Sequence, residues 1–240
     1  MIARVLVPLA LLLASCSAGD EEPSARHDGT GEPRGPRGQG PARCEGASAD
    51  PPELDAIAVR AERDLEGAIV ALEALAGAHP GSATARARLG ELSLRTGPPR
   101  AEQAERWFAR ALALHEAGCT LAYRDRWASL EGSALARMMR GDYEGAIPFL
   151  RRSLDEWPNV RSTRYNFACA LCRTGDLDGC GRELRAVLDA EGTPGPSWLG
   201  EQRRPPGHYA RRAREDPDLA PLRADPDRFE RATGLPLGPR

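Results

Sequence analysis

The chain has 240 residues, of which 28% are charged and 5% aromatic, and its formal net charge at pH 7 is −2. This weakly acidic balance gives no electrostatic basis for binding nucleic acid, so we expect no nucleic-acid partner. All 33 basic residues are arginine, and a chain without lysine has no P-loop lysine, Schiff-base lysine or Ser-x-x-Lys acylase.

The first 15 residues have the pattern of an export signal. Residues 5–13 are largely apolar, a run too short to cross a hydrocarbon core of ~30 Å. The sequence Leu13-Ala14-Ser15-Cys16 follows and resembles the bacterial lipobox, which implies that Cys16 is the lipidation site. Ser17 in place of Asp resembles the outer-membrane class of lipoproteins. The resemblance implies a Gram-negative lipoprotein on the outer membrane, facing the periplasm, that contacts the membrane through its lipid anchor only.

Residues 16–52 are predicted to be a disordered linker. Positions 17–52 hold 7 Gly and 6 Pro and no Val, Ile, Leu, Met, Phe, Trp or Tyr. Such a segment cannot bury enough apolar surface to offset the entropy of ordering. The folded part is therefore expected to begin at residue 53.

From residue 53 the sequence repeats itself with a period near 34. Ala68, Ala104, Ala146 and Cys180 occupy one equivalent small position, at steps of 36, 42 and 34 residues. Glycines at the expected helix ends, and prolines after two of the second helices, divide the chain into helical pairs: Gly97, Gly141, Gly175, Pro80 and Pro158. A single pair cannot bury its apolar face, so stacked neighbours must form the core.

This pattern resembles the tetratricopeptide repeat, a 34-residue helix–turn–helix unit. The resemblance implies an all-α fold, a solenoid of about four helix pairs over residues 53–192, with units near 53–82, 83–118, 127–160 and 161–192. Residues 193–240 are predicted to form a C-terminal cap and tail. His208 to Glu215 has the length of a short helix, and Asp216 and Asp225 each precede a proline as helix N-caps do. The segment after Glu215 resembles the end-of-group segment of bacterial arrays of this repeat.

No hydrolase, metalloprotease or EF-hand motif occurs, so we predict no catalytic residue, no metal site, no cofactor and no small-molecule substrate. Five cysteines remain besides Cys16: Cys44, Cys119, Cys169, Cys172 and Cys180. A disulfide between Cys172 and Cys180 is one interpretation, and a redox or metal-binding protein using Cys169, Cys172 and Cys180 is the alternative function. The favoured interpretation is that Cys180 fills the small-residue position of its helix and that the other cysteines are compact apolar residues.

The resemblance also implies a groove lined by the first helix of each unit, and helical spacing then selects its residues. Leu135, Met138, Met139 and Tyr165 are expected to form an apolar strip flanked by charges, and the full predicted set is Glu91, Leu94, Arg95, Glu131, Leu135, Met138, Met139, Tyr165 and Arg173. Such a strip suits an extended or helical peptide. The predicted function is a non-catalytic scaffold that binds a protein or peptide and assists assembly of a cell-envelope complex.

Overall fold

The computed structural model describes residues 51–199 and 204–237, and every regular element within these ranges is a helix. Eight helices form four consecutive pairs: α1 (Glu53–Arg60) with α2 (Leu65–Ala78), α3 (Ala83–Arg95) with α4 (Ala101–Glu116), α5 (Tyr123–Met139) with α6 (Tyr143–Glu156), and α7 (Arg161–Thr174) with α8 (Leu177–Asp189). Shorter elements complete the chain: η2 (Pro98–Arg100), η3 (Ser197–Leu199), α9 (His208–Glu215), η5 (Pro217–Leu219), α10 (Ala220–Arg223) and α11 (Pro226–Thr233). The expected all-helical fold is confirmed.

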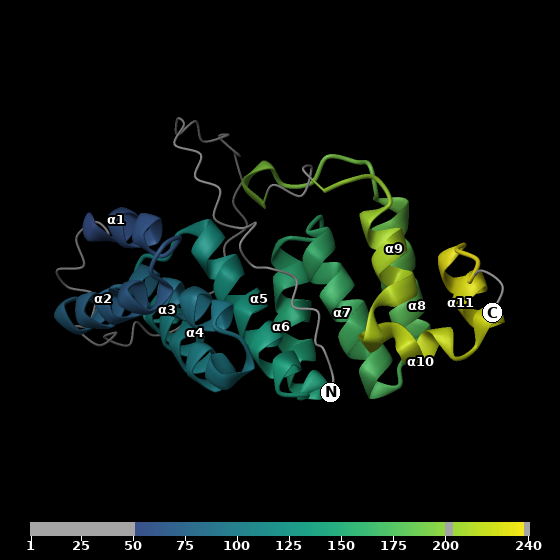
Figure 1. The fold of residues 1–240 in the computed structure, drawn as a ribbon, viewed down its shortest axis with the longest axis horizontal. Coiled ribbons are helices and arrows are strands. Elements are labelled where there is room, and N and C mark those ends of the chain that lie inside the picture. The colour runs from purple at the N-terminus through teal and green to yellow at the C-terminus, as the bar shows by residue number, and fades with distance from the viewer. Residues whose placement is uncertain (1–50, 200–203, 238–240) are drawn as a thin grey trace, which may run out of the picture.

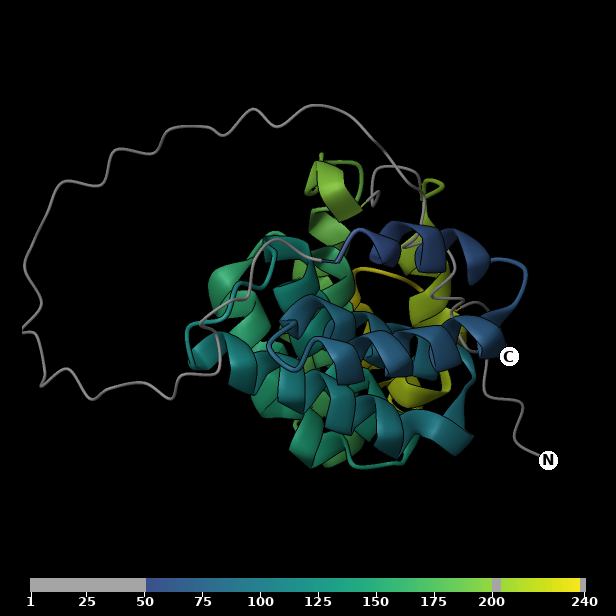
Figure 2. The same ribbon diagram turned by 90° about the vertical axis from the view of Figure 1, so that its left-hand side faces the viewer.

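The four pairs stack in chain order to form an α-solenoid (Figure 1). Each helix packs on the next one, and α3 also packs on α5, while α5 contacts α7. The helices α3, α5 and α7 therefore form one layer of the stack, and Figure 2 looks along this stack from the α1–α2 end. We call the surface of α3, α5 and α7 that faces away from α4, α6 and α8 the inner face.

The same local signals begin and end the helices in successive pairs. Asp64, Asp142 and Asp176 each accept a hydrogen bond from the backbone N–H three residues later, which caps the N-termini of α2, α6 and α8. Gly141 and Gly175 have φ values of +84° and +90° just after α5 and α7, a conformation that side chains with a Cβ rarely adopt. The predicted helix ends at these glycines are confirmed.

The second and third pairs share a core side chain. Phe108 of α4 is fully buried and inserts between Gly90 of α3 and Gly132 of α5. A Cβ atom on Gly90 would lie 2.5 Å from the ring, and one on Gly132 would also overlap it. The two glycines thus allow three helices from two pairs to approach closely around one ring.

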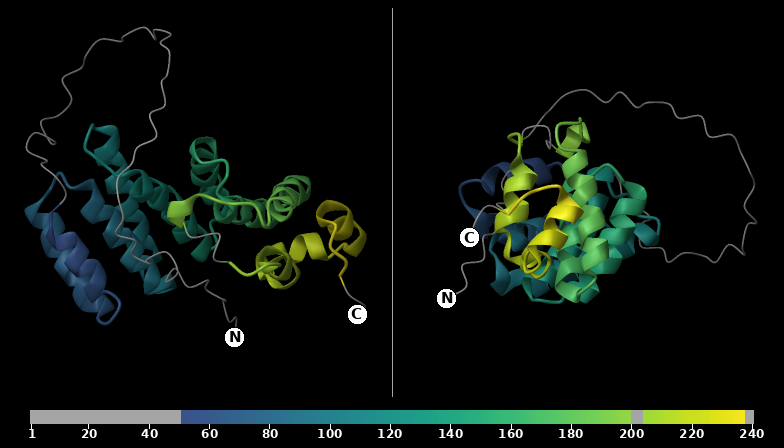
Figure 3. Two further views of the ribbon diagram at one scale, coloured as in Figure 1. Left: turned by 90° about the horizontal axis from the view of Figure 1, so that it is seen from above. Right: turned by 90° about the vertical axis from the view of Figure 1, so that its right-hand side faces the viewer.

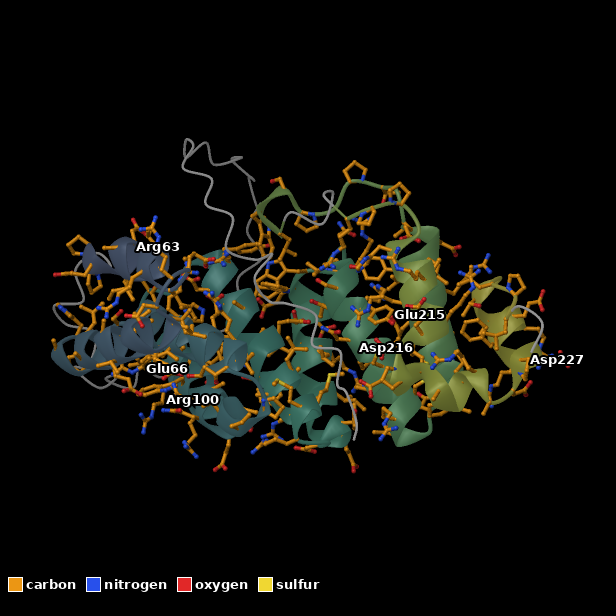
Figure 4. All side chains as sticks on the ribbon, in the orientation of Figure 1. Arg63, Glu66, Arg100, Glu215, Asp216 and Asp227 are labelled. Carbon is orange, nitrogen blue, oxygen red and sulfur yellow. A yellow bond between two sulfur atoms is a disulfide. The ribbon has the colours of Figure 1, made fainter. Side chains whose placement is uncertain are left out.

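Ion pairs on the outside of the stack also join one pair to the next. Arg100 of η2 contacts Glu66 of α2 at 2.6 Å, and Figure 4 shows the two side chains together beneath these helices. The Arg100 side chain is 33% exposed and that of Glu66 is 63% exposed, so water screens the pair and the contact contributes little stability.

The C-terminal elements cover the last pair. Leu219, Leu222 and Phe229 are fully buried, and η5, α10 and α11 pack on α7 and α8. Figure 3 shows α9 and α10 lying along one side of the stack, with α11 beyond them at the end of the chain. The short helix His208–Glu215 and the N-cap positions of Asp216 and Asp225 agree with the prediction.

The cysteines differ from the favoured interpretation. Cys172 of α7 and Cys180 of α8 form a disulfide with a Cα–Cα distance of 5.1 Å, so they are not separate apolar side chains. The turn at Gly175 reverses the chain between the two helices and brings these positions together. Cys119 is also disulfide-bonded, whereas Cys169 is a buried free thiol.

The predicted lipidation site Cys16 and nearly all of the predicted linker, residues 16–50, lie outside the described residues. Among the helices of the described part, none has both the length and the apolar character needed to cross a membrane.

Candidate functional site

A cluster of four charged side chains joins the inner helices α3 and α5. The Arg88 guanidinium contacts the carboxylates of Glu91 and Asp125 at 3.0 Å each, and Arg124 contacts the same two carboxylates at 3.7 and 3.4 Å. Both carboxylates are nearly buried, whereas the two guanidinium groups remain about one-quarter exposed. Burial acts to lower the pKa of Arg88, but the two carboxylates outweigh it and raise this pKa. The cluster fixes α3 against α5, and sequence spacing alone did not single out Arg88, Arg124 or Asp125.

The predicted residue Arg95 is committed to the first helix pair. Its guanidinium donates to Glu62 at 3.2 Å and to the backbone carbonyl of Ala61 at 3.2 Å. The side chain is mostly buried, so it joins the end of α3 to the turn between α1 and α2. Arg95 therefore has a structural role, because its ion pair with Glu62 attaches α3 to the first helix pair.

Three of the predicted apolar residues lie together. Leu94 of α3 is buried in a small core cluster with Phe108, and Leu135 and Met139 of α5 pack against this cluster while staying partly exposed. These two side chains form the apolar surface that α5 presents beside α3. Of the four residues of the predicted strip, the structure thus brings together Leu135 and Met139 only.

Glu131 joins α5 to α7. Its side chain is buried, and it accepts a hydrogen bond from the Asn166 side-chain amide across the two inner helices. The predicted groove residue Glu131 therefore fixes the spacing of α5 and α7.

The remaining predicted residues lie beneath or beside the C-terminal segment. Tyr165 is fully buried, and its hydroxyl donates to Asp216 at 3.1 Å. The guanidinium of Arg212 lies 4.3 Å from the centre of the Tyr165 ring and pairs with Asp216 at 2.8 Å. Figure 4 shows Asp216 where the C-terminal segment passes over α7. Burial raises the pKa of the Tyr165 phenol, which stays a neutral donor.

Met138 and Arg173 are the other two predicted groove residues near the C-terminal segment. Met138 is buried in the core cluster that also contains Tyr165, so it does not share a surface with Met139. Arg173 is exposed, lies over the Tyr143 ring at 5.0 Å and faces Asp218 at 3.9 Å. The inner face of α7 is thus covered by the chain itself, whereas the predicted strip had Tyr165 open to a partner. The physical reason is long-range: the aspartates that cover α7 come about 50 residues later, beyond any repeat period.

Cys169, Asp216 and Asp218 place three potential metal-ligand atoms within 4.8 Å of one another. Burial, together with the two aspartates, raises the pKa of the Cys169 thiol, so the thiol is protonated at neutral pH. Asp216 already binds Arg212, and Asp218 accepts a hydrogen bond from Tyr143 at 2.6 Å. A cation would have to compete with the charge of Arg212, so this donor set fits a hydrogen-bonded network better than a metal centre.

The alternative redox or metal-binding role is also affected by the disulfide. Cys172 and Cys180 are 1% and 0% exposed and are bonded to each other. In this state they offer no thiolate to a metal, and their burial separates them from a redox partner in solution. The disulfide therefore acts as a cross-link between α7 and α8.

No protein-family model matches the sequence, and no curated protein matches it. Among solved structures, the chain is similar to that of YrrB, whose crystal structure is described as that of a TPR protein with an unusual peptide-binding site. The two sequences are 19% identical, the similarity covers 75% of this chain and 83% of that one, and the TM-score is 0.48. The class of protein rests on the chain's own helix pairs, which define an α-solenoid resembling tetratricopeptide repeats.

Proposed function

We propose that this chain is a non-catalytic scaffold that binds a segment of a partner protein on the inner face of α3 and α5. The proposal is supported by two partly exposed apolar side chains of α5, Leu135 and Met139, which pack against the same core cluster. The ion cluster between α3 and α5 fixes these two helices against each other. A rigid surface with an apolar centre and charged borders suits a peptide that has apolar anchors. Met139 adds a flexible side chain that adapts to the partner's shape.

The charged groups of this face favour recognition over catalysis. Arg88, Arg124, Glu91 and Asp125 are paired with one another, so their charges are largely satisfied within the chain. A general acid or base must exchange a proton with a substrate, whereas these four groups are engaged in ion pairs with one another. The quarter-exposed guanidinium groups can still attract acidic residues that flank the partner's apolar anchors.

We further propose that the chain is an exported lipoprotein anchored at Cys16, on the periplasmic face of the outer membrane. The support is the sequence Leu13-Ala14-Ser15-Cys16 after a short apolar run, followed by Ser17. In this position the scaffold assists assembly of a cell-envelope complex, with the partner held at the inner face. The partner is expected to present a segment with apolar anchors flanked by acidic residues.

The face is tested with full-length chain carrying Leu135→Gln and Met139→Gln. Glutamine keeps the side-chain length and removes the apolar surface. A photo-crosslinking side chain at position 135, which is partly exposed, captures partners of the otherwise unchanged chain. The affinity of each captured protein should then be at least tenfold lower for the variant than for the parent chain. The matched control is Val70→Gln on the outer side of α2, where Val70 is 64% exposed and substitution should leave the affinity unchanged. Equal affinity of the inner-face variant and the parent chain would overturn the proposal, provided that their helical circular dichroism is the same.

The anchor is tested separately with Cys16→Ser. The parent chain should be in the outer-membrane fraction and carry the mass of a lipid group on residue 16, and the variant should lose both properties. A parent chain without this added mass would contradict lipidation and would leave the inner-face proposal untouched.

A further inference from the structure

The connection between α8 and α9 sends a short arm back along the edge of the stack. Arg161 at the start of α7 donates to the carbonyls of Ala190 and Thr193, at 2.7 and 2.8 Å, and so holds the beginning of the connection. Residues 194–199, which we call the arm, then run to the single turn of η3. Figure 1 shows this connection leaving the end of α8 and running above the stack towards α5 and α6.

The arm ends on a cluster of aromatic and aliphatic side chains. Trp198 makes edge-to-face contacts with Tyr123 and Trp127, with ring centres 5.6 and 5.4 Å apart. Leu199 is buried in the same cluster. We call the receiving residues the aromatic edge, and they come from the ends of four helices: Leu112, Tyr123, Trp127, Trp157 and Val160.

The aromatic edge is held in place by contacts that do not involve the arm. The indole N–H of Trp127 donates to the Thr163 hydroxyl at 3.1 Å, which fixes this ring between α5 and α7. Tyr123 lies edge-to-face on Trp157 at 5.0 Å, and Arg126 lies 5.9 Å from the centre of the Trp157 ring. Because these contacts do not depend on the arm, the aromatic edge should keep its arrangement when the arm leaves it.

The arm itself is weakly held by comparison. Its sequence, Pro194-Gly195-Pro196-Ser197-Trp198-Leu199, has two prolines that donate no backbone hydrogen bond and a glycine with high conformational freedom. Trp198 and Leu199 are its only large apolar side chains, and Trp198 stays partly exposed. Burial of the large apolar side chains of the arm is therefore confined to Trp198 and Leu199.

The aromatic edge also contains a buried hydrogen-bond donor, the indole N–H of Trp157. Trp157 is 4% exposed, and its indole Nε1 has no hydrogen-bond partner in the described part of the chain. A buried donor without an acceptor is costly, and a backbone carbonyl of a bound segment would remove that cost. Tyr123, by contrast, is 59% exposed and leaves the edge accessible from solvent.

We propose that the aromatic edge is a second binding site, for a partner polypeptide that presents an aromatic residue followed by an aliphatic one. Trp198 and Leu199 are the intramolecular occupant of this site, and the partner displaces them. This site is separate from the inner face of α3 and α5 and does not depend on the function proposed for that face. Displacement leaves the cap in position, because Tyr165 and Asp216 hold the segment after α9 independently of the arm.

The tether sets the strength of the competition. A segment linked to its own site has a high effective concentration, which lowers the apparent affinity for any free ligand in proportion to the fraction of sites left open. Removal of the occupant side chains should therefore raise the affinity for a free peptide without altering the edge.

The experiment uses the full chain with Trp198→Ser and Leu199→Ser, which empties the edge. The probe is a fluorescent peptide with the sequence of residues 192–199, and binding is measured by anisotropy. We expect saturable binding to the emptied variant, at least tenfold weaker binding to the parent chain, and none with a peptide in which the same two residues are serine. No binding to the emptied variant, or equal affinity for both proteins, would overturn the proposal.

Two further measurements locate the site and its natural occupant. Adding Tyr123→Ala to the emptied variant should weaken peptide binding at least fivefold, whereas adding Val59→Ala, at an exposed position on α1, should not change it. Helical circular dichroism confirms that each variant is folded. The parent chain should sediment as a monomer, and a dimer that disappears in the emptied variant would assign the edge to the arm of a second copy and overturn the partner proposal.

Discussion

The phenol of Tyr165 and the carboxylate of Asp216 are 51 residues apart in the sequence, and the Tyr165 hydroxyl donates to Asp216 at 3.1 Å. This bond joins the inner helix α7 to the end of α9. Arg212 reinforces it from above, because its guanidinium contacts both the ring and the carboxylate. The C-terminal segment is thus attached to the repeats by a specific polar contact in addition to its buried leucines.

Tyr165→Phe should lower the free energy of unfolding by about 1–3 kcal/mol, because it removes a hydrogen bond to a charged acceptor and leaves Asp216 with one donor fewer. Urea denaturation gives this value, and hydrogen exchange should show the largest loss of protection in residues 208–223. Tyr123→Phe is the control, since its exposed ring keeps its contacts. Unchanged protection of residues 208–223 in Tyr165→Phe would mean that this bond does not hold the segment.

Gly90→Ala and Gly132→Ala should each lower the free energy of unfolding by about 1–3 kcal/mol, because the added methyl group overlaps the Phe108 ring. The control is Gly77→Ala in α2, where a Cβ atom meets no other atom within 4 Å. That substitution should stabilise the chain by about 0.5–1 kcal/mol through helix propensity. Urea denaturation compares the three variants, and a stabilising effect at Gly90 or Gly132 would contradict the described packing.

Replacing both Cys172 and Cys180 by alanine should lower the free energy of unfolding by about 2–3 kcal/mol, because the cross-link no longer restricts the unfolded chain. Thermal denaturation of the variant and parent chains measures the difference. Alkylation of the unfolded, unreduced parent chain should modify Cys169 and spare the other two. Modification of Cys172 or Cys180 under these conditions would show that the disulfide is absent.

His208 should make the stability depend on pH. Burial, with Arg204 and Arg212 nearby, lowers its pKa from 6.5 to about 4 in the folded chain. Between these values the unfolded chain binds a proton that the folded chain does not, so the free energy of unfolding falls as the pH decreases from 6.5 to 4. His208→Gln should show a shallower decrease over this window in urea denaturation at several pH values. Identical slopes for variant and parent would exclude His208 as the source.

The sequence predicted what is set locally. Helix ends at Gly141 and Gly175 and the helix N-cap at Asp216 depend on a few neighbouring residues, so spacing and residue type were sufficient. The all-helical stack was implied by the resemblance of this repeat to the tetratricopeptide unit. The Cys172–Cys180 disulfide was only one of several interpretations, because its formation depends on how α7 and α8 pack.

The candidate site was predictable only in part. Helical spacing placed Met138, Met139 and Tyr165 on one strip, but these side chains belong to two different core clusters. The period of the repeat also contains no information on where a later segment folds back. The contacts of Asp216 with Tyr165 and of Trp198 with Trp127 are long-range, and no local pattern in the sequence indicates them.

The position of Phe108 also limits how the chain can be divided. The ring belongs to the second helix pair, while one of the two glycines that enclose it belongs to the third. A fragment ending near residue 118 would leave one side of this ring in water, and a fragment beginning near residue 123 would leave an empty notch on α5. The middle of the solenoid is thus a single cooperative unit, and fragments intended to fold alone should keep residues 83–156 intact.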